Sequence, residues 1–411
     1  MKRSAVLVPL LFTACLGLLT ACGGSGNAQP QAAPAQETEK AAEETQAQEA
    51  EAAPAAEGTA NVAGIVTSMA ANSENSYRVD YLEQDPYLTT VYAGFGFAKD
   101  YTSAIGHTYT LEDVANTARP HPLANCLTCK TPDYTRLVNE LGEEAYSMDF
   151  EEVYADMKNT VSCYNCHGAD DGNGGELTVT HSYVTKALGD SGDTIAPQVQ
   201  ACGQCHIEYY FAPETKATSM PYDSVAAMSP EAILAYYDEM GFADWTQEAT
   251  GVAMLKAQHP EFETFMGEGS KHKALLTCAD CHMEDVVDEN GNYTSHKFES
   301  PLQNENILGT CAKCHGDTDM TEYVHGIQEA VTAKEKEVGE SLAAFNDALA
   351  AKVAEGASDE DLAEVRQIYR SAQWYWDFCY VENSEGAHNS ALANDCLDRA
   401  AELISQGMEL L

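Results

Sequence analysis

Basic side chains are scarce in this chain. Lysine and arginine together number 22 against 65 aspartate and glutamate residues, which gives a formal net charge of −43. A protein that binds nucleic acid needs positive surface for the phosphates, so this balance argues against a nucleic-acid partner. The 411 residues are enough for two or three domains or for one large one.

The N-terminal apolar stretch, residues 5–19, is shorter than the ~20 residues that a transmembrane helix needs. Two basic residues precede it, an order that is typical of a signal peptide. Leu19-Thr20-Ala21-Cys22 then resembles a bacterial lipobox. We therefore predict a signal peptide over 1–21 and a lipid on Cys22, with ordinary secretion and a nearby cleavage site as the alternative.

Apolar side chains are almost absent from residues 23–60, which consist mainly of Gly, Ala, Glu, Gln and Pro. Such a segment cannot bury enough surface to offset the entropy lost on ordering. We predict a disordered tether over 22–60 that carries part of the net charge. The protein is expected to be exported, with its lipid anchor on the outer face of the cytoplasmic membrane or in the periplasm.

The cysteines do not form the pattern of a disulfide scaffold, because ten of the fourteen fall in five Cys-x-x-Cys pairs. A single such pair is also compatible with a disulfide, a zinc half-site or a thioredoxin-like site. Four pairs with histidine next in sequence favour c-type haem, in which both thiols bind the porphyrin and the histidine binds the iron. These sites are Cys163, Cys166 and His167; Cys202, Cys205 and His206; Cys278, Cys281 and His282; and Cys311, Cys314 and His315.

The first pair differs from the other four, because Cys126 and Cys129 are followed by Lys130. A lysine ammonium must lose its proton before it can bind a metal. A chain with four standard sites and one unusual site is predicted to reserve that iron for chemistry. Five irons have ten axial positions, and the adjacent residues fill five of them. Eight of the twelve histidines remain for four distal positions if one iron stays open.

Helical patterns are clearest in the C-terminal part. Ser229-Pro230-Glu231 opens a predicted helix through about residue 240. Three further helices are predicted over about 327–354, from Ser358 through 380, and over about 392–410. Residues 77–109 are expected to be irregular. Cys379 and Cys396 fall on adjacent predicted helices, where a disulfide and two free thiols are both open.

Four segments, together with the five sites in this order, resemble the ammonia-forming pentahaem cytochrome c nitrite reductases. They are 202–211 (CGQCHIEYYF), 254–260 (MLKAQHP), 373–377 (QWYWD) and 383–389 (NSEGAHN). The resemblance spans about 77–410. It implies a mainly α, multihaem cytochrome c fold with packed c-type haems, long C-terminal helices and little β. Within one domain, 61–325 would hold the five haems and 326–411 would form a helical bundle that makes a dimer contact.

The resemblance also implies a role for individual residues. The distal haem ligands would be His296 at the second site, His107 at the third, His388 at the fourth and His272 at the fifth. Arg119, Tyr209 and His259 would line the catalytic pocket above the Lys130-ligated iron. A calcium ion near this pocket would be held by the Glu208 carboxylate, the Tyr209 and Lys256 carbonyls and the Gln258 side chain, all oxygen donors that suit a hard cation.

The implied reaction is the six-electron reduction of nitrite to ammonium, with four bis-histidine haems relaying electrons. The implied partners are a second copy of the chain and a membrane-anchored multihaem quinol dehydrogenase. An electron-transfer cytochrome in which His121 caps the first iron is one alternative, and a reductase for hydroxylamine, nitric oxide or sulfite is another. Arg119 lies closer to Lys130 than in longer family members, so a surface arginine is its alternative. His121 follows this arginine closely, which would place it near the pocket, and no role is assigned to it, to His181 or to His325.

Overall fold

The structure is a computed structural model that describes residues 61–74 and 77–411. The predicted signal peptide (1–21), the lipidated Cys22 and the tether (22–60) lie outside the described residues. All described residues belong to one compact unit. Both predicted regions, 61–325 and 326–411, lie within that unit.

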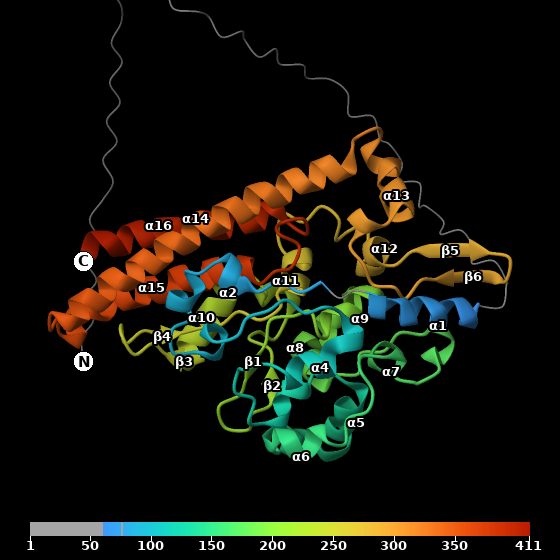
Figure 1. Cartoon of the computed structure of the whole chain (residues 1–411), viewed down its shortest axis with the longest axis horizontal. Coiled ribbons are helices and arrows are strands. Elements are labelled where there is room, and N and C mark those ends of the chain that lie inside the picture. Colours follow the sequence, from blue (N-terminus) through green and yellow to red (C-terminus); the bar gives the residue numbers. More distant parts are fainter. Residues whose placement is uncertain (1–60, 75–76) are drawn as a thin grey trace, which may run out of the picture. The chain divides into compact units, whose positions relative to one another are not determined.

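Helices dominate the described residues (Figure 1). The α-helices are α1 (Val62–Ala70), α2 (Tyr81–Gln84), α3 (Leu88–Val91), α4 (Thr110–Ala115), α5 (Pro132–Leu141), α6 (Phe150–Tyr154), α7 (Cys163–His167), α8 (Ser182–Leu188), α9 (Pro197–Gly203), α10 (Pro230–Met240), α11 (Glu261–Met266), α12 (Cys278–His282), α13 (Glu305–His315), α14 (Met320–Ala354), α15 (Asp359–Tyr380) and α16 (Ser390–Leu410). Short 3-10 helices connect several of them.

The strands are short and form three separate two-stranded antiparallel ladders. They are β1 (Tyr210–Phe211) with β2 (Thr218–Ser219), β3 (Trp245–Thr246) with β4 (Ala253–Met254), and β5 (Asp285–Asp288) with β6 (Gly291–Thr294). The predicted mainly α fold with little β is therefore confirmed. The region 77–109 contains the short helices α2 and α3, 3-10 turns and an isolated β-bridge between Asp80 and Thr102.

The three long C-terminal helices pack against one another (Figure 1). Each begins at a polar cap: Asp319, Ser358 and Asn389 accept the backbone N–H of residues 322, 361 and 392. The helix α14 starts seven residues earlier than predicted, so the predicted boundary at 325/326 falls inside it. Its first turns are exposed or half-buried, and apolar periodicity could not detect them.

This bundle continues into the part of the chain that carries the predicted catalytic residues. One buried apolar cluster includes Trp376 of α15, Phe345 of α14, Tyr92 just after α3, and Met254 of β4. The cluster fixes the segment 254–260 against α15. The described helices include none that is both long and apolar enough to cross a membrane.

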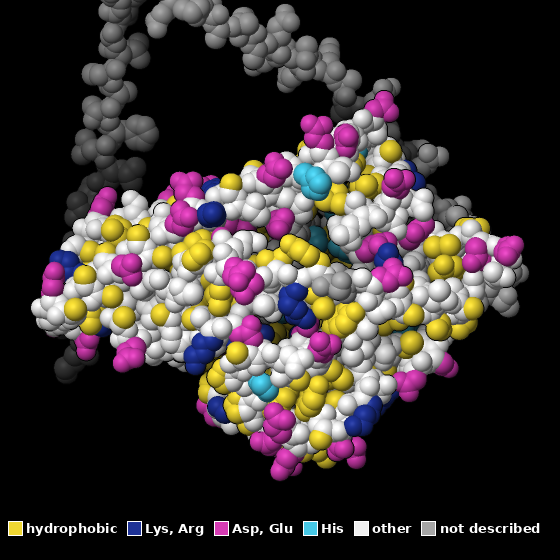
Figure 2. Space-filling model, in the orientation of Figure 1, with side chains coloured by type: hydrophobic (Ala, Val, Ile, Leu, Met, Phe, Trp, Pro, Cys, Tyr) yellow, Lys and Arg dark blue, Asp and Glu magenta, His cyan; other side chains and the backbone are white. Residues whose placement is uncertain are grey.

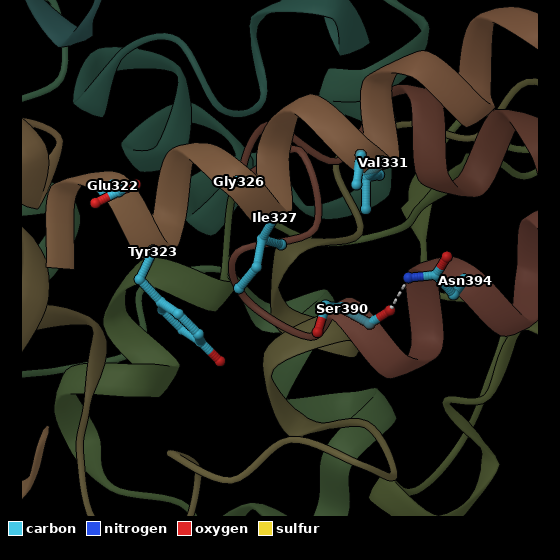
Figure 3. Close-up of a pocket in the computed structure, with 8 residues that line it drawn as sticks. Glu322, Tyr323, Gly326, Ile327, Val331, Ser390 and Asn394 are labelled. Atoms are coloured by element: carbon cyan, nitrogen blue, oxygen red, sulfur yellow. Dashed lines mark hydrogen bonds between the residues drawn. The ribbon is translucent and has the colours of Figure 1, made fainter. Parts of the chain in front are cut away.

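The surface in Figure 2 carries many acidic side chains and few basic ones, in line with the composition. A pocket of about 460 Å³ lies between the first turns of α14 and α16 (Figure 3). Small residues of α14, Gly326 and Ala330, leave it open beside Tyr323 and Asn394. None of the predicted catalytic or haem-binding residues lines this pocket.

Candidate functional site

Each Cys-x-x-Cys site lies on a short helical segment. A spacing of three and four residues puts both thiols and the following side chain on one face of a helical turn. The helices α7 and α12 consist of little more than this motif, and each is fixed by a capping box, Ser162 with Asn165 and Thr277 with Asp280. The third motif begins in the last turn of α9 and the fifth ends α13, whereas the first site begins in the 3-10 helix Ala124–Leu127 and has Cys129 and Lys130 in the turn after it.

The structure brings the five sites together. The Cys129 thiol lies within hydrogen-bonding reach of Cys205, and the Cys202 thiol within reach of Cys278. Electrostatic interactions likewise connect the second site to the third and the fourth to the fifth. The sites therefore form one connected cluster with the third at its centre, as closely packed haems require.

Each motif histidine faces the distal histidine that was predicted for it. The ring centres are 6.3 Å apart for His167 and His296, 6.3 Å for His206 and His107, 6.0 Å for His282 and His388, and 6.2 Å for His315 and His272. A metal–imidazole bond is about 2 Å long, so two rings on opposite sides of one metal have centres about 6 Å apart. The spacing of all four pairs fits a metal between the rings.

Hydrogen bonds at the Nδ1 atoms of several of these rings also fit metal binding through Nε2. The Nδ1 atoms of His167, His282 and His296 lie 2.7, 3.0 and 2.9 Å from backbone carbonyl oxygens. The Nδ1 of His388 lies 2.6 Å from a Glu382 carboxylate oxygen. A proton on Nδ1 leaves the Nε2 lone pair free for a metal. At His107, burial lowers the pKa to about 4, so that ring is neutral at neutral pH and able to bind a metal.

The ring centre of His259 also lies 6.3 Å from that of His206, but the two rings are not placed to share a metal. The Nδ1 atoms of both rings approach the same Glu261 oxygen, at 3.7 Å for His206 and 3.8 Å for His259. His259 is therefore on the Nδ1 side of His206, away from the Nε2 that would face His107. Burial alone would raise the pKa of Glu261, but the two histidines hold it well below its usual range.

The predicted catalytic residues gather at the first site. Burial raises the pKa of the Tyr209 hydroxyl well above its usual range, with the nearby Cys129 and Cys126 adding to the shift and the Arg119 charge opposing it. Burial also lowers the pKa of His259, which Glu261 opposes and the Lys130 ammonium reinforces. Tyr209 thus keeps its proton and His259 is neutral at neutral pH, and both lie within electrostatic reach of the first site.

The remaining histidines have other surroundings. His121 directs Nδ1 to the Arg119 carbonyl at 2.9 Å, and its Nε2 lies 4.0 Å from Glu151. His181 is buried, with Nε2 3.5 Å from the Cys205 sulfur. His325 is exposed on α14.

Three of the predicted calcium ligands are in contact. Glu208 is fully buried, and its carboxylate accepts the Tyr237 hydroxyl at 2.9 Å and the Gln258 backbone N–H at 2.6 Å. The Gln258 side-chain amide lies 3.0 Å from the Lys256 carbonyl. Burial raises the pKa of Glu208 well above its usual range, so a cation beside it would stabilise its charged form. Among the described residues no three histidine, cysteine or carboxylate side chains form a metal site, and the predicted donor set contains one such side chain.

Sequence reasoning assigned no role to several residues that shape this site. Asp377 accepts the Lys256 ammonium at 3.0 Å and the Ala257 N–H at 2.9 Å, so it ties α15 to the segment that ends in His259. Asp377 stands in one of the motifs that carry the family resemblance, and that was its only signal. Glu261 and Phe97, which lies under Arg119, had none.

Residues 28–411 match the cytochrome c552 family. The fold is similar to that of the catalytic subunit of the cytochrome c nitrite reductase from Desulfovibrio desulfuricans, described as having two calcium sites. The TM-score is 0.75 at 28% sequence identity, over 84% of this chain and 83% of that one.

Two larger cytochromes are less similar. The outer cell wall cytochrome OcwA aligns with a TM-score of 0.40 and 19% identity, over 73% of this chain and 48% of that one. The undecahaem cytochrome from the S-layer of Carboxydothermus ferrireducens aligns with a TM-score of 0.39 and 18% identity, over 76% and 42%. Neither likeness is high enough to support an inference. Family and fold together confirm the resemblance to the cytochrome c nitrite reductases, a class of oxidoreductase, and the chain belongs to the cytochrome c552 family.

Proposed function

We propose that this protein reduces nitrite to ammonium at the first haem site, with Lys130 as the axial ligand and four bis-histidine haems relaying electrons. The arrangement of the histidines carries the proposal. Four pairs have ring centres 6.0–6.3 Å apart, each joining a motif histidine to a distal one. The Lys130 site is left without such a partner and has Arg119, Tyr209 and His259 around it.

The surroundings of His121 favour an enzyme over an electron-transfer cytochrome. Capping the first iron would require a free ring nitrogen directed at it. The Nδ1 of His121 lies 2.9 Å from the Arg119 carbonyl oxygen, its Nε2 is directed towards Glu151 at 4.0 Å, and its ring packs edge-on against Phe150 at 4.2 Å. His181 is buried with its Nε2 3.5 Å from the Cys205 sulfur of the third site, and His325 is exposed on α14. One iron with an open face is what a small substrate needs.

The residues at the first site suit an anion that must gain protons. The Arg119 guanidinium can bind nitrite oxygens through charge-assisted hydrogen bonds worth about 1.5–3 kcal/mol each. The Tyr209 hydroxyl holds a proton, and neutral His259 can accept one from solvent and pass it on as N–O bonds break. Glu261 beside His259 would stabilise the ring when it is charged.

When bound, haem supplies one-electron transfer at each site and an iron that can hold nitrite at the first. Nitrite reduction to ammonium takes six electrons and eight protons, more than one site can store. The first and third sites and the third and fourth sites are in thiol contact, the second and third and the fourth and fifth interact electrostatically, and this proximity would give the electrons short routes. Function therefore needs the whole array.

A calcium ion would neutralise part of the buried negative charge near the first haem site. We assign it to the Glu208 carboxylate, the Tyr209 and Lys256 carbonyls and the Gln258 side chain. Asp244 interacts electrostatically with Glu208, and burial raises its pKa to about 7, so a cation here would stabilise the charged forms of both carboxyl groups. An ion there would fix the segment that presents Tyr209 and His259. Metal analysis of the purified protein should find calcium, and Glu208→Gln should lose it.

We also propose the location that the N-terminal sequence suggests and the partners that the family resemblance implies. A lipid on Cys22 would hold the exported protein at the membrane, within reach of a membrane-anchored multihaem quinol dehydrogenase as electron donor. The long helices of the bundle, with α14 and α16 at the surface, would make the homodimer contact.

The test is an electronic and EPR spectrum of the purified protein with and without nitrite. We expect one high-spin ferric component that changes when nitrite is added, and four low-spin components that do not. Five low-spin haems indifferent to nitrite would instead support an electron-transfer cytochrome. Product assays with nitrite, hydroxylamine, nitric oxide and sulfite would then rank the substrates.

A further inference from the structure

The Arg119 guanidinium rests on an aromatic ring. Its Cζ lies 4.3 Å from the centre of the Phe97 ring, and its Nε donates to Thr117 Oγ1 at 2.9 Å. Among the described residues no carboxylate lies within 4.0 Å of this guanidinium, and its terminal amino groups have no hydrogen-bond partner. The guanidinium is thus held by the hydrogen bond at Nε and by the Phe97 ring against its plane, while its two terminal amino groups can bind a ligand.

The Phe97 ring is itself fixed by other aromatic rings. Tyr101 meets it edge-on with centres 4.8 Å apart, Phe95 lies at 5.8 Å and Tyr92 at 6.1 Å. Phe95 in turn stacks on Trp245 at 4.5 Å. Aromatic pairs at these distances favour defined mutual orientations. The ring is therefore a preorganised support.

The backbone under Arg119 is also closely fitted. A Cβ on Gly96 would lie 3.3 Å from Cβ and Cγ of Arg119 and 3.4 Å from Cδ of Pro120. Thr117, which accepts the Arg119 Nε–H, donates its hydroxyl to Asp100 at 2.7 Å. The loop 117–120 is therefore pressed against 96–97.

A second cation, Lys256, lies near the same ring, but its charge is paired with a carboxylate. Lys256 Nζ lies 5.1 Å from the Phe97 ring centre, but its charge is paired with Asp377 at 3.0 Å. An aromatic face attracts a cation without cancelling its charge, whereas a carboxylate would compete with any anion that the cation must bind. Of the two cations at this ring, only Arg119 has no carboxylate within 4.0 Å among the described residues, and Asp100, which accepts the Thr117 hydroxyl, interacts with it from a longer distance.

We propose that Phe97 is a positioning residue for the substrate anion: its ring holds the Arg119 guanidinium in place and leaves the terminal amino groups and the charge to nitrite. This inference rests on the proposed function, because it assumes that Arg119 binds nitrite at the first site. Phe97 would act on the substrate through its contact with Arg119.

The experiment compares Phe97→Leu, which keeps an apolar side chain but removes the ring, with Phe97→Tyr, which restores a ring face. Phe95→Leu is the control for a general loosening of the aromatic cluster, because Tyr101 and Tyr92 still hold the Phe97 ring in that variant and the Arg119 guanidinium lies over Phe97 and not over Phe95. Nitrite KM, kcat and a spectral Kd for nitrite are measured on holoprotein with full haem content. We expect Phe97→Leu to raise KM and Kd roughly 3- to 30-fold, with a smaller change in kcat. Phe97→Tyr and Phe95→Leu should stay within about 2-fold of the parent protein.

Two further variants test whether Phe97 acts through Arg119 and whether its aromatic face, rather than its volume, is responsible. In an Arg119→Ala background, Phe97→Leu should have no additional effect on nitrite affinity, because the two residues act through one contact. A ring-fluorinated phenylalanine at position 97 keeps the shape but weakens the negative face, so it should raise KM even if Phe97→Leu fails to assemble.

The outcomes are distinguishable. A parent protein that does not reduce nitrite would overturn the proposed function and this inference with it. An active parent whose nitrite affinity is unchanged in Phe97→Leu and in the fluorinated protein would overturn the inference alone. An equal loss in Phe95→Leu would do the same, because the effect would then come from the aromatic cluster as a whole.

Discussion

At the scale of single residues, Lys130 is the ligand that sets the first site apart. Replacing it tests whether lysine matters or whether any axial ligand will do. We expect Lys130→His to keep the haem attached but to lower nitrite turnover by about 10-fold or more, the scale of loss seen when groups around a metal change. The measurement is haem content together with steady-state nitrite reduction. Turnover equal to that of the parent would show that lysine has no special role.

We expect the buried Glu335 to make the stability of the fold depend on pH. It is 7% exposed, and burial together with Glu382, Glu385 and Asp85 raises its pKa to about 9. Because the folded state holds the proton more tightly than the unfolded chain, its contribution to stability is complete below about pH 4.5 and is lost as the pH rises towards 9. We expect Glu335→Gln to flatten this loss, which is at most about 1.4 kcal/mol per pH unit for one group.

The measurement is the free energy of unfolding at pH 5, 7 and 9. The exposed Glu337→Gln on the same helix is the control and should follow the parent. A parent protein whose stability is constant over this range would contradict the prediction.

At the scale of elements, the helices of the bundle approach closely where glycine permits it. A Cβ on Gly407 of α16 would lie 2.0 Å from the Phe345 ring of α14. Alanine normally favours a helix over glycine by about 1 kcal/mol, but here the methyl group has no room. We expect Gly407→Ala to lower the free energy of unfolding by about 1–3 kcal/mol.

Gly326→Ala on α14 is the matched control, because nothing lies within 4 Å of the added Cβ. It should stabilise the protein by up to about 1 kcal/mol. Denaturant unfolding of both variants checks the pair, and a gain in stability for both would show that the two helices are less closely packed.

The helices themselves were predictable where their signals are local. The caps Ser229 and Ser358 and the apolar spacing placed α10 and α15 correctly. The start of α14 was missed because its first turns carry no apolar stripe. The single-turn helices α7 and α12 were not predicted, since a helix that short is stabilised by its capping box and surroundings and not by periodicity.

At the scale of the whole molecule, features encoded by neighbouring residues could be predicted from the sequence, whereas features that join distant residues could not. The attachment motifs are contiguous in sequence and could be recognised directly. The distal histidines could be paired only through family resemblance, because His388 and His282 are more than a hundred residues apart and nothing local joins them. Phe97 and Glu261 acquire their roles only from contacts made on folding, so no sequence pattern could assign them, and Asp377 was marked only by its place in the 373–377 motif, which does not show what it binds.

The net charge leads to a last prediction. Nitrite is an anion, and the chain carries a formal charge of −43, so the long-range field opposes its approach while Arg119 attracts it only at close range. The Debye length is about 10 Å at 0.1 M salt, so added salt screens the distant repulsion more than the contact inside the pocket. We expect kcat/KM for nitrite to rise a few-fold as ionic strength increases from about 0.01 to 0.1 M. Hydroxylamine, which is neutral at pH 7, is the control and should show no such rise. If kcat/KM for nitrite falls with salt instead, the positive field of the pocket extends further than the acidic surface allows, and Arg119→Ala would then remove the fall.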